Sequence, residues 1–314
     1  MLTKRLTFGA VALAAVVAGV LLVRSQGCWG TFAFEISREE VYEAEDIGIL
    51  RGGDITRVTH ENLSTYASLS PDAERVVFGR AKSYGDETGF QRLSLYVANV
   101  DGTGEELLVR DGGQPSWSPV ANEVLVLSGN AIRVVDVETK EERIVYELPS
   151  PRGANPVDPD YIGEAEWSAD GKRIAFFVGK TDRARSENAR YYTELWVVGA
   201  DGSNPHRITA LDDVLPTDLA WSPDGRTFAW SGMDGPAPSL IFMDADDVEP
   251  RAGEPNARSP HWSRDGDQLA YVIGHEGHYD FRIVVGDADG SDAVTVPGSP
   301  REEGGLSFED WVSC

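Results

Sequence analysis

Short apolar stretches separated by turn residues recur along the chain from about residue 31 to its end. Each repeat opens on a Trp-Ser or similar step, passes through a turn that is often Asp-Gly, and enters an apolar strand. The openings are roughly 40–55 residues apart, and self-similarity at this period is typical of a propeller or a solenoid. The openings are Leu69-Ser70, Trp117-Ser118, Trp167-Ser168, Trp221-Ser222, Trp262-Ser263 and Trp311-Val312.

The pattern within each repeat predicts four short antiparallel strands. In the repeat that opens at Trp167, residues 174–177 and 195–198 are rich in β-branched and aromatic residues, which strands favour. An Asp-Gly turn at 201–202 then leads to a fourth strand near residues 207–209. Four antiparallel strands in about 45 residues form one propeller blade, and we expect the opening Trp to be buried between adjacent blades.

The sixth repeat is divided between the two ends of the chain. Residues 31–34 resemble the second strand at 227–230, and residues 306–311 supply an innermost strand. We therefore predict an all-β, six-bladed β-propeller with four antiparallel strands per blade, closed by the C-terminal strand joining the N-terminal strands in one blade. Residues 37–40 (SREE) match a capping box and predict one helical turn inside that blade.

The first 30 residues differ from the rest of the chain. Lys4 and Arg5 precede residues 6–23, which carry no charge and are mostly apolar, as in a hydrophobic helix. This segment fits an anchor in the inner membrane, a cleaved signal peptide, or a signal for lipidation of Cys28. All three place the folded part outside the cytoplasm, in a periplasmic or extracellular location. We therefore divide the chain into a signal peptide or anchor at 1–30 and a propeller at 31–314.

The two cysteines lie at opposite ends of the folded region. Aligning the divided blade with residues 221–230 places Cys28 and Cys314 in the same hairpin turn. In an oxidising compartment this favours a single Cys28–Cys314 disulfide. Lipidation of Cys28, which would exclude the bridge, and two unrelated thiols are the alternatives.

The chain is strongly acidic, with 52 acidic and 28 basic residues and a formal net charge of −24. Such a surface repels phosphate backbones, so we exclude nucleic acid as a partner. High charge also favours solubility, and we expect a monomer without a cofactor.

Three segments carry a resemblance to a known family. Residues 221–230 (WSPDGRTFAW), 167–180 (WSADGKRIAFFVGK) and 194–209 (ELWVVGADGSNPHRIT) resemble the repeats of TolB-type, WD-like β-propellers. The resemblance covers residues 31–314 and implies a six-bladed propeller in the cell envelope, as TolB is periplasmic. TolB carries a separate domain before its propeller, for which this chain has no room, so the resemblance implies the fold rather than the Tol-Pal partners.

Motifs for catalysis or metal binding are scarce. Residues 304–308 (GGLSF) do not match a nucleophile elbow. His275 and His278 are three residues apart instead of the four that a zinc-protease helix requires, and the glycines around them favour a hairpin loop. Residues 287–292 (DADGSD) lack the spacing and terminal Glu of an EF-hand and are interpreted as a turn. We predict no catalytic residue and no metal site.

Loop length distinguishes the two faces of the predicted ring. The long connections, at residues 37–46, 80–92, 149–164, 180–192 and 274–280, all fall on one face, and the other face has tight turns. Recognition usually takes place on loops carried by a rigid scaffold, and Tyr and Arg are frequent interface anchors. The candidate binding residues on this face are Arg183, Arg185, Arg190, Tyr191, Tyr192, Tyr84, Phe90, Tyr161, His278 and Tyr279.

Two classes of function remain. The first is a non-catalytic scaffold outside the cytoplasm that binds a protein or peptide partner of the cell envelope on the loop-rich face or at the channel mouth. The alternative is a propeller enzyme, of the lyase or glycan hydrolase type, with carboxylates near the central channel. A pocket with paired carboxylates and a histidine favours the enzyme, and a wide or apolar mouth favours the scaffold. Acidic residues expected to reach the axis are Asp158, Asp160, Asp212, Asp213 and Asp218.

Overall fold

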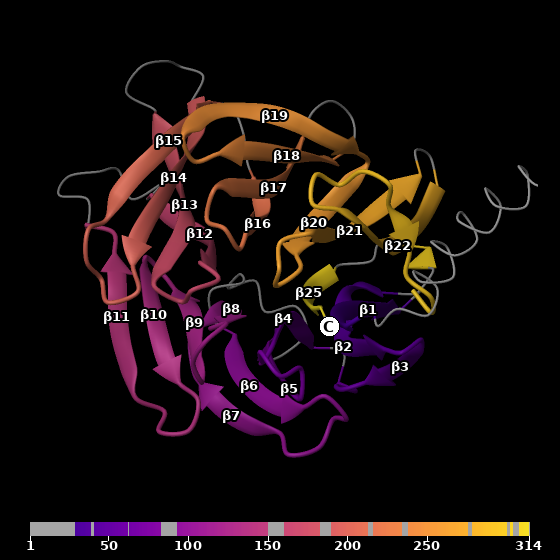
Figure 1. Cartoon of the computed structure of the whole chain (residues 1–314). Coiled ribbons are helices and arrows are strands. Elements are labelled where there is room, and N and C mark those ends of the chain that lie inside the picture. Colours follow the sequence, from indigo (N-terminus) through magenta and orange to yellow (C-terminus); the bar gives the residue numbers. More distant parts are fainter. Residues whose placement is uncertain are drawn as a thin grey trace, which may run out of the picture.

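Six antiparallel sheets stand around a common axis in the computed structural model of the chain (Figure 1). The prediction of an all-β propeller with six blades of four antiparallel strands is therefore confirmed, with one short additional strand in the last blade. The structure describes residues 29–38, 41–61, 63–82, 93–149, 160–182, 190–212, 216–233, 238–275, 278–299, 302–303 and 308–313.

We number the blades along the chain and give their strands from the axis to the rim. Blade 1 contains β25 (Phe308–Val312), β1 (Thr31–Arg38), β2 (Val41–Arg51) and β3 (Asp54–Arg57). Blade 2 contains β4 (Ser64–Leu69), β5 (Arg75–Arg80), β6 (Ser94–Asn99) and β7 (Glu106–Val109). Blade 3 contains β8 (Gly113–Trp117), β9 (Glu123–Ser128), β10 (Ala131–Asp136) and β11 (Glu142–Glu147).

The remaining blades follow the same order. Blade 4 contains β12 (Tyr161–Trp167), β13 (Arg173–Asp182), β14 (Arg190–Gly199) and β15 (His206–Asp212). Blade 5 contains β16 (Thr217–Trp221), β17 (Thr227–Met233), β18 (Pro238–Asp244) and β19 (Asp247–Pro255). Blade 6 contains β20 (Ala257–Trp262), β21 (Gln268–His275), β22 (His278–Asp287) and β23 (Val294–Thr295), and β24 (Glu302–Glu303) also pairs with β22.

The ring closes through blade 1, as the divided sixth repeat predicts. β25 pairs with β1, with Thr31 opposite Val312 and Phe32 opposite Trp311. The Trp311 ring stacks on Phe32 with a centroid distance of 5.8 Å, and its Nε1 donates a 2.9 Å hydrogen bond to the carbonyl of Trp29. The two ends of the folded region are therefore joined by both backbone pairing and a buried aromatic contact.

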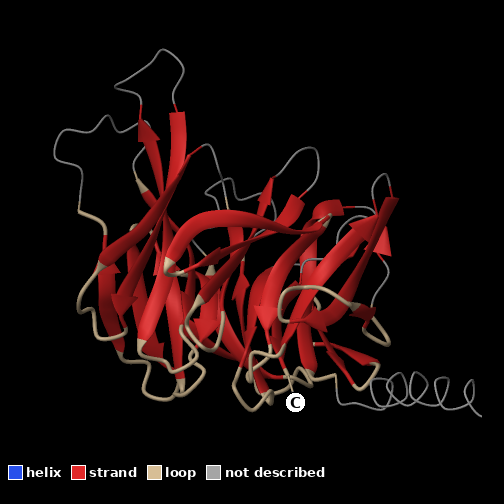
Figure 2. Cartoon of the chain, turned by 45° about the horizontal axis from the view of Figure 1, so that its top comes forward, coloured by secondary structure: helices blue, strands red, loops and turns tan. Residues whose placement is uncertain are grey.

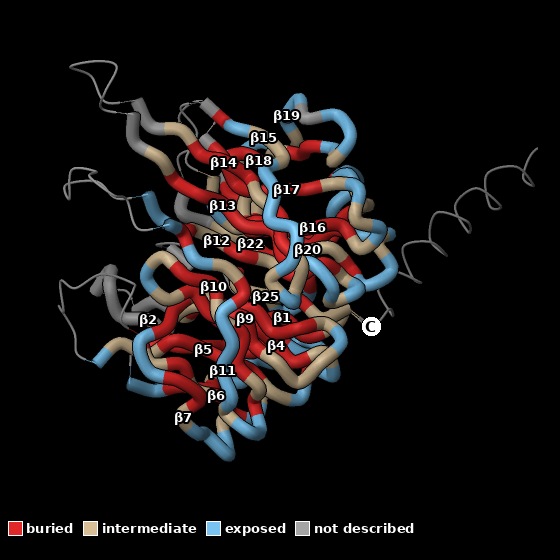
Figure 3. Tube along the Cα trace, turned by 90° about the vertical axis from the view of Figure 1, so that its left-hand side faces the viewer, coloured by how far each residue is buried: buried red, intermediate tan, exposed pale blue. Residues whose placement is uncertain are grey.

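The opening Trp residues lie in the core between blades, which appears as a buried interior in Figure 3. Trp117, Trp167 and Trp221 are 6 % exposed or less. Burial of one such ring contributes ~4–6 kcal/mol by area. Arg173, at the start of the second strand of blade 4, lies 4.6 Å from the ring centroid of Trp221 in blade 5, so a cation–π contact adds to the packing between these blades.

The Ser of each Trp-Ser step fixes the turn that follows it. In blade 5 the Ser222 hydroxyl donates to Asp224 at 2.7 Å and accepts from the N–H of Thr227 at 2.8 Å. The bond from Ser222 holds the pKa of Asp224 below its usual value. Gly225 completes the turn at a φ of +72°, where a glycine is favoured. The recurring Trp-Ser-x-Asp-Gly pattern is thus a structural turn.

Three hairpins are longer than the sequence predicts. β1 continues to Arg38 and β2 begins at Val41, so the helical turn expected at 37–40 and the long loop expected at 37–46 are wrong. The reason is that the two strands keep pairing beyond the buried core, with Ser37 opposite Glu45. β13 with β14 and β21 with β22 likewise extend into the segments predicted as loops at 180–192 and 274–280.

The hydrophobic segment at 6–23 and both cysteines lie outside the described residues. The hydrophobic helix, its role as anchor or signal peptide, and the disulfide therefore stay predictions. In the part of the chain that the structure describes, no helix has the length and apolar character needed to cross a membrane.

We expect Ser222→Ala to lower the free energy of unfolding by about 1–2 kcal/mol, because it removes the acceptor of the buried Thr227 N–H. Urea denaturation followed by tryptophan fluorescence measures this loss. Ser118→Ala in blade 3 is the matched control, since the Ser118 hydroxyl accepts a long 3.5 Å bond from the Val120 N–H. An equal loss in both variants would contradict the role of the serine in the turn.

We also propose that the oxidised protein contains the Cys28–Cys314 bridge. Gly30 packs against Val312 and Ser313; Cys28 is two residues before Gly30, and Cys314 directly follows Ser313. A disulfide that closes a loop of this length raises the free energy of unfolding by at most about 5–6 kcal/mol. Mass spectrometry of a non-reduced tryptic digest should show one linked peptide pair. Two free thiols, or a lipid on Cys28, would rule the bridge out.

Candidate functional site at the propeller axis

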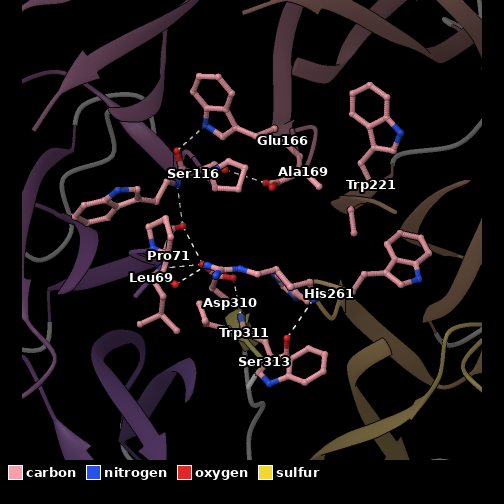
Figure 4. A pocket seen from close by; sticks show the side chains of 18 of the residues that line it. Leu69, Pro71, Ser116, Glu166, Ala169, Trp221, His261, Asp310, Trp311 and Ser313 are labelled. Atoms are coloured by element: carbon pink, nitrogen blue, oxygen red, sulfur yellow. Dashed lines mark hydrogen bonds between the residues drawn. The ribbon is translucent and has the colours of Figure 1, made fainter. Parts of the chain in front are cut away.

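The six innermost strands, β25, β4, β8, β12, β16 and β20, surround the axis of the ring (Figure 1). They line a cavity of about 180 Å³ (Figure 4). The residue before the opening Trp or Leu of each repeat lines this cavity, because successive side chains of a strand point to opposite sides. We call these six residues the cavity tier: Asp310, Ser68, Ser116, Glu166, Ala220 and His261.

A second tier lies two residues earlier on the same strands, at a bulge where the pairing register shifts. Five residues there have a positive φ although none is glycine. This conformation is uncommon for side-chain-bearing residues, and its recurrence at one position in five blades makes it a feature of the architecture. We call these residues the bulge tier: Tyr66, Gln114, Glu164, Asp218 and Ser259.

Hydrogen bonds of the cavity tier connect one blade to the next. Asp310 of blade 1 accepts bonds from the Ser68 hydroxyl at 2.9 Å and the Leu69 N–H at 2.7 Å, both in blade 2. Glu166 of blade 4 accepts a 3.0 Å bond from the Ser116 hydroxyl of blade 3. The carboxylates at the axis therefore hold neighbouring blades together.

The bulge tier is connected in the same way. Gln114 of blade 3 donates a 2.7 Å bond to Glu164 of blade 4. Asp218 of blade 5 accepts a 2.6 Å bond from Ser231, whose hydroxyl accepts from the backbone N–H of Ser259 in blade 6. These bonds place a second set of carboxylates at a fixed position around the axis.

Two of the axial glutamates have strongly perturbed acidity. Burial, with the charge of Asp218, raises the pKa of Glu164 to about 8, against the opposing bond from Gln114. Burial, with the charges of Asp310 and Glu164, raises the pKa of Glu166 to about 8. Both side chains are only partly exposed. At neutral pH both are mostly protonated, which relieves repulsion among the axial carboxylates.

A half-buried arginine supplies positive charge near the bulge tier. Arg258 lies at the beginning of β20, 4.3 Å from the ring centroid of Phe281, and it interacts electrostatically with Asp218, Glu309 and Glu35. Burial lowers the pKa of Arg258, and the three carboxylates oppose this effect. Arginine keeps its charge under such conditions.

The structure describes only part of the predicted binding set. Tyr161 begins β12 and is 45 % exposed, and Tyr192 lies in β14 opposite Lys180. The backbones of Arg190 and Tyr191 continue β14, and those of His278 and Tyr279 belong to β22. The structure thus brings Tyr161 and Tyr192 to the same end of blade 4. Arg183, Arg185, Tyr84 and Phe90 lie outside the described residues.

The acidic residues expected at the axis have different positions. Asp218 lies in the bulge tier. Asp160 instead pairs with Lys180 at 2.8 Å, because Lys180 on the neighbouring strand is within reach. Asp212 ends β15, and Asp158 and Asp213 lie outside the described part of the chain.

Sequence reasoning missed four residues of the site: Glu164, Glu166, His261 and Asp310. The signal was present, since Glu166, His261 and Asp310 each precede an opening Trp and must face away from it. Glu164 is harder to find, because the bulge that positions it leaves no recurring residue type in the sequence.

Metal chemistry receives no support from the described part of the chain, where no group of three His, Cys, Asp or Glu residues is arranged to hold an ion. Residues 287–292 form the predicted turn, with the Gly290 N–H bonded to the carbonyl of Asp287 at 2.8 Å.

No protein family model matches the chain. The uncharacterized protein Atu1656 of Agrobacterium fabrum is 27 % identical over 225 residues, which cover 65 % of this chain and 68 % of that protein. Among solved structures, TolB from Acinetobacter baumannii superposes with a TM-score of 0.64 at 17 % identity, over 94 % of this chain and 70 % of TolB.

Two further structures show the same fold. A putative TolB from Agrobacterium tumefaciens has a TM-score of 0.55 at 15 % identity, over 90 % of this chain and 99 % of its own. A chain of a nidogen/laminin complex has a TM-score of 0.56 at 12 % identity, over 88 % and 97 % of the two chains. The protein therefore has the fold of TolB-like propellers, which confirms the resemblance seen in its repeats. Identities this low show the fold alone.

Glu164→Gln and Glu166→Gln are expected to raise the melting temperature by about 2–5 °C at pH 9 and to have little effect at pH 5. Each glutamate has a folded-state pKa of about 8 against an ordinary value of 4.5. The folded state therefore binds more protons between these values, and wild-type stability falls as pH rises from about 4.5 through 8.

Differential scanning fluorimetry across this pH range measures the effect. Glu141→Gln, at an exposed position on the turn before β11, is the control and should follow the wild type. If the melting temperatures of the wild type and the two axial variants changed in parallel with pH, the raised pKa values of Glu164 and Glu166 would be contradicted.

Proposed function

We propose that the protein is a non-catalytic scaffold that binds a protein or peptide partner outside the cytoplasm, at the channel mouth opposite the tight turns. The observation that carries this proposal is the role of the axial carboxylates. Asp310, Glu164 and Glu166 each accept a hydrogen bond from the neighbouring blade, so they serve to hold the ring together. A rigid ring with a polar axis is a suitable platform for recognition.

The choice of face follows from the arrangement of the connections. Most of the described loops and turns lie together on one side of the ring (Figure 2). Tyr161 and Tyr192 lie at the opposite ends of their strands. Arg183, Arg185 and Arg190, the predicted basic and aromatic island, follow β13 in the sequence, and we propose that they belong to the same face. Tyr and Arg are favoured anchors in interfaces, which supports binding on this face.

An envelope location is part of the proposal. The similarity in fold to TolB propellers supports it, as does the uncharged segment at residues 6–23. We propose that this segment acts either as an anchor in the inner membrane or as a cleaved signal peptide, and that the propeller is a monomer.

An enzyme of the lyase or glycan hydrolase type is the second candidate, because the cavity contains Glu166, Asp310 and His261, the combination of paired carboxylates and a histidine that favours an enzyme. Nδ1 of His261 lies 3.2 Å from the carbonyl of Ser259, which leaves Nε2 for other contacts. A protonated Glu166 near a hydrogen-bonded Asp310 is the kind of pair that acid–base catalysis uses.

Two observations favour the scaffold over this enzyme. The carboxylates of Glu166 and Asp310 are already bonded to neighbouring blades. The cavity of about 180 Å³ is also smaller than the 300–1,000 Å³ of typical ligand sites. At the tight-turn end of the cavity, Arg264 connects three blades, since its guanidinium donates to the carbonyl of Pro71 and its backbone N–H to the Ser313 hydroxyl.

Charge reversal of Arg183, Arg185 and Arg190 to Glu should reduce partner capture about tenfold without changing the melting temperature, because it removes predicted interface anchors and leaves every apolar side chain in place. Crosslinking in the native envelope, followed by affinity purification and mass spectrometry, measures capture. The double reversal of Lys172 and Arg226, two exposed cations on the tight-turn face, is the control and should retain wild-type capture. Equal capture by the triple variant and wild type would count against this face.

A further inference from the structure

We infer that the junction between blades 4 and 5 at the channel mouth is a binding notch for an arginine side chain of the partner. The notch consists of the ring of Tyr161 and the carboxyl groups of Glu164 and Asp218. This inference rests on the proposed function and specifies the chemistry of the partner.

The Tyr161 ring lies on the backbone of two glycines. In the β12–β13 pair Tyr161 is opposite Gly179, where an added Cβ would come within 2.3 Å of the ring atoms Cε1 and Cζ. A Cβ on Gly163 would be 3.4 Å from Cε2 of the same ring. The absence of a side chain at Gly179 lets the ring cover the sheet, while 45 % of Tyr161 stays exposed. An exposed aromatic ring held in one place is pre-organised for stacking.

The position of Gly179 shows which junction the ring borders. Phe177 lies two residues before Gly179 on β13, so both face the same side of the sheet. Phe177 packs in the core cluster that also contains Leu219 and Trp221 of blade 5. The Tyr161 ring therefore lies on the side of blade 4 that faces blade 5.

Two carboxyl groups occupy equivalent bulges on the two innermost strands that flank this junction. Glu164 follows Tyr161 by three residues on β12, and Asp218 occupies the equivalent bulge of β16 in blade 5. The charge of Asp218 adds to burial in raising the pKa of Glu164, as expected of two carboxyl groups on adjacent innermost strands. Gln114 donates to Glu164 from blade 3, and Arg258 approaches Asp218 from blade 6. The junction of blades 3 and 4 thus has a hydrogen-bond donor and that of blades 5 and 6 has a cation, whereas the junction of blades 4 and 5 has a carboxyl group on each side.

A guanidinium group fits this arrangement better than other side chains. It is planar and stacks on an aromatic face, and it forms paired hydrogen bonds with carboxylates. Its charge would offset the repulsion between Glu164 and Asp218. Glu164 would then ionise, so binding at neutral pH should release a proton.

The test uses the full chain and the peptide acetyl-Gly-Gly-Arg-Gly-Gly-amide, with the citrulline peptide as its uncharged counterpart. Isothermal titration calorimetry at pH 7 and low salt should show at least tenfold weaker binding of the citrulline peptide. Titrations in buffers of different ionisation enthalpy should show proton release on arginine binding. Glu164→Gln should abolish the release and weaken binding.

Variants of Tyr161 separate stacking from general attraction to an acidic protein. Tyr161→Ala should lower the affinity for the arginine peptide about tenfold, and Tyr161→Phe should retain it. Gly179→Ala should act like Tyr161→Ala, because the new methyl group displaces the ring. Ile144→Ala, at a 62 % exposed position on the rim of blade 3, is the control and should have no effect.

Equal affinity for both peptides, or wild-type affinity in Tyr161→Ala, would overturn the notch. Capture of the native partner by crosslinking tests the scaffold proposal separately from the notch proposal. If Tyr161→Ala captures the partner normally while the triple arginine variant does not, the scaffold stands without the notch. If wild type captures no partner, the proposed function fails.

Discussion

Pairing between the last strand and the first one is the contact on which the whole ring depends. A propeller blade has two apolar faces and is stable only when neighbours cover both. In blade 1, β25 contributes Trp311 to a cluster with Phe32 and with Ile283 of blade 6. The other face of the blade contributes Ile49 to the cluster shared with blade 2. The bond from Trp311 to Trp29 spans 282 residues, so blade 1 cannot be completed until the end of the chain is in place.

Closure has an electrostatic consequence, because it brings polar side chains from six innermost strands to one axis. Glu166 and Asp310 come from blades 4 and 1, yet their charges repel each other. The fold reduces this repulsion in two ways: donors such as Ser68 and Ser116 bond to the carboxylates from the adjacent blade, and burial keeps Glu166 protonated. The axis thus connects blades through polar groups, while the Trp residues connect them through apolar contacts. Both kinds of contact run between consecutive blades, so in blades 1 to 4 the residue before the opening Trp or Leu also helps to join the ring.

The repeats predict the number of blades, the strands within them and the closure, because each depends on local apolar patterns and recurring turns. The Trp-Ser-x-Asp-Gly steps are the clearest case, since their hydrogen bonds are made within one turn, as between Ser222 and Asp224. The extended hairpin at 31–51 could not be predicted, because strands that continue beyond the core carry polar residues and lose the apolar alternation. The axial site was found only in part. Asp218 was anticipated from its connection, but the position of Glu164 depends on a bulge, and bulges are set by tertiary packing.

The backbone bulge at Glu164 and the exposed ring of Tyr161 differ in what they indicate about function. A positive φ at Glu164 recurs at the equivalent residues of four other blades, so it belongs to the architecture and says nothing of a ligand. An aromatic ring also covers a strand glycine in other blades, where Phe34 lies on Gly48, Phe242 on Gly253 and Phe281 on Gly274. Phe34 and Phe242 are buried and Phe281 is half-buried, whereas 45 % of Tyr161 is exposed. The same blade also carries Glu164, Glu166 and the extended β13–β14 hairpin. The exposed Tyr161 ring is not needed to close the propeller, whereas the carboxyl groups of Glu164 and Glu166 are. Selection for binding rather than for stability would therefore act on Tyr161.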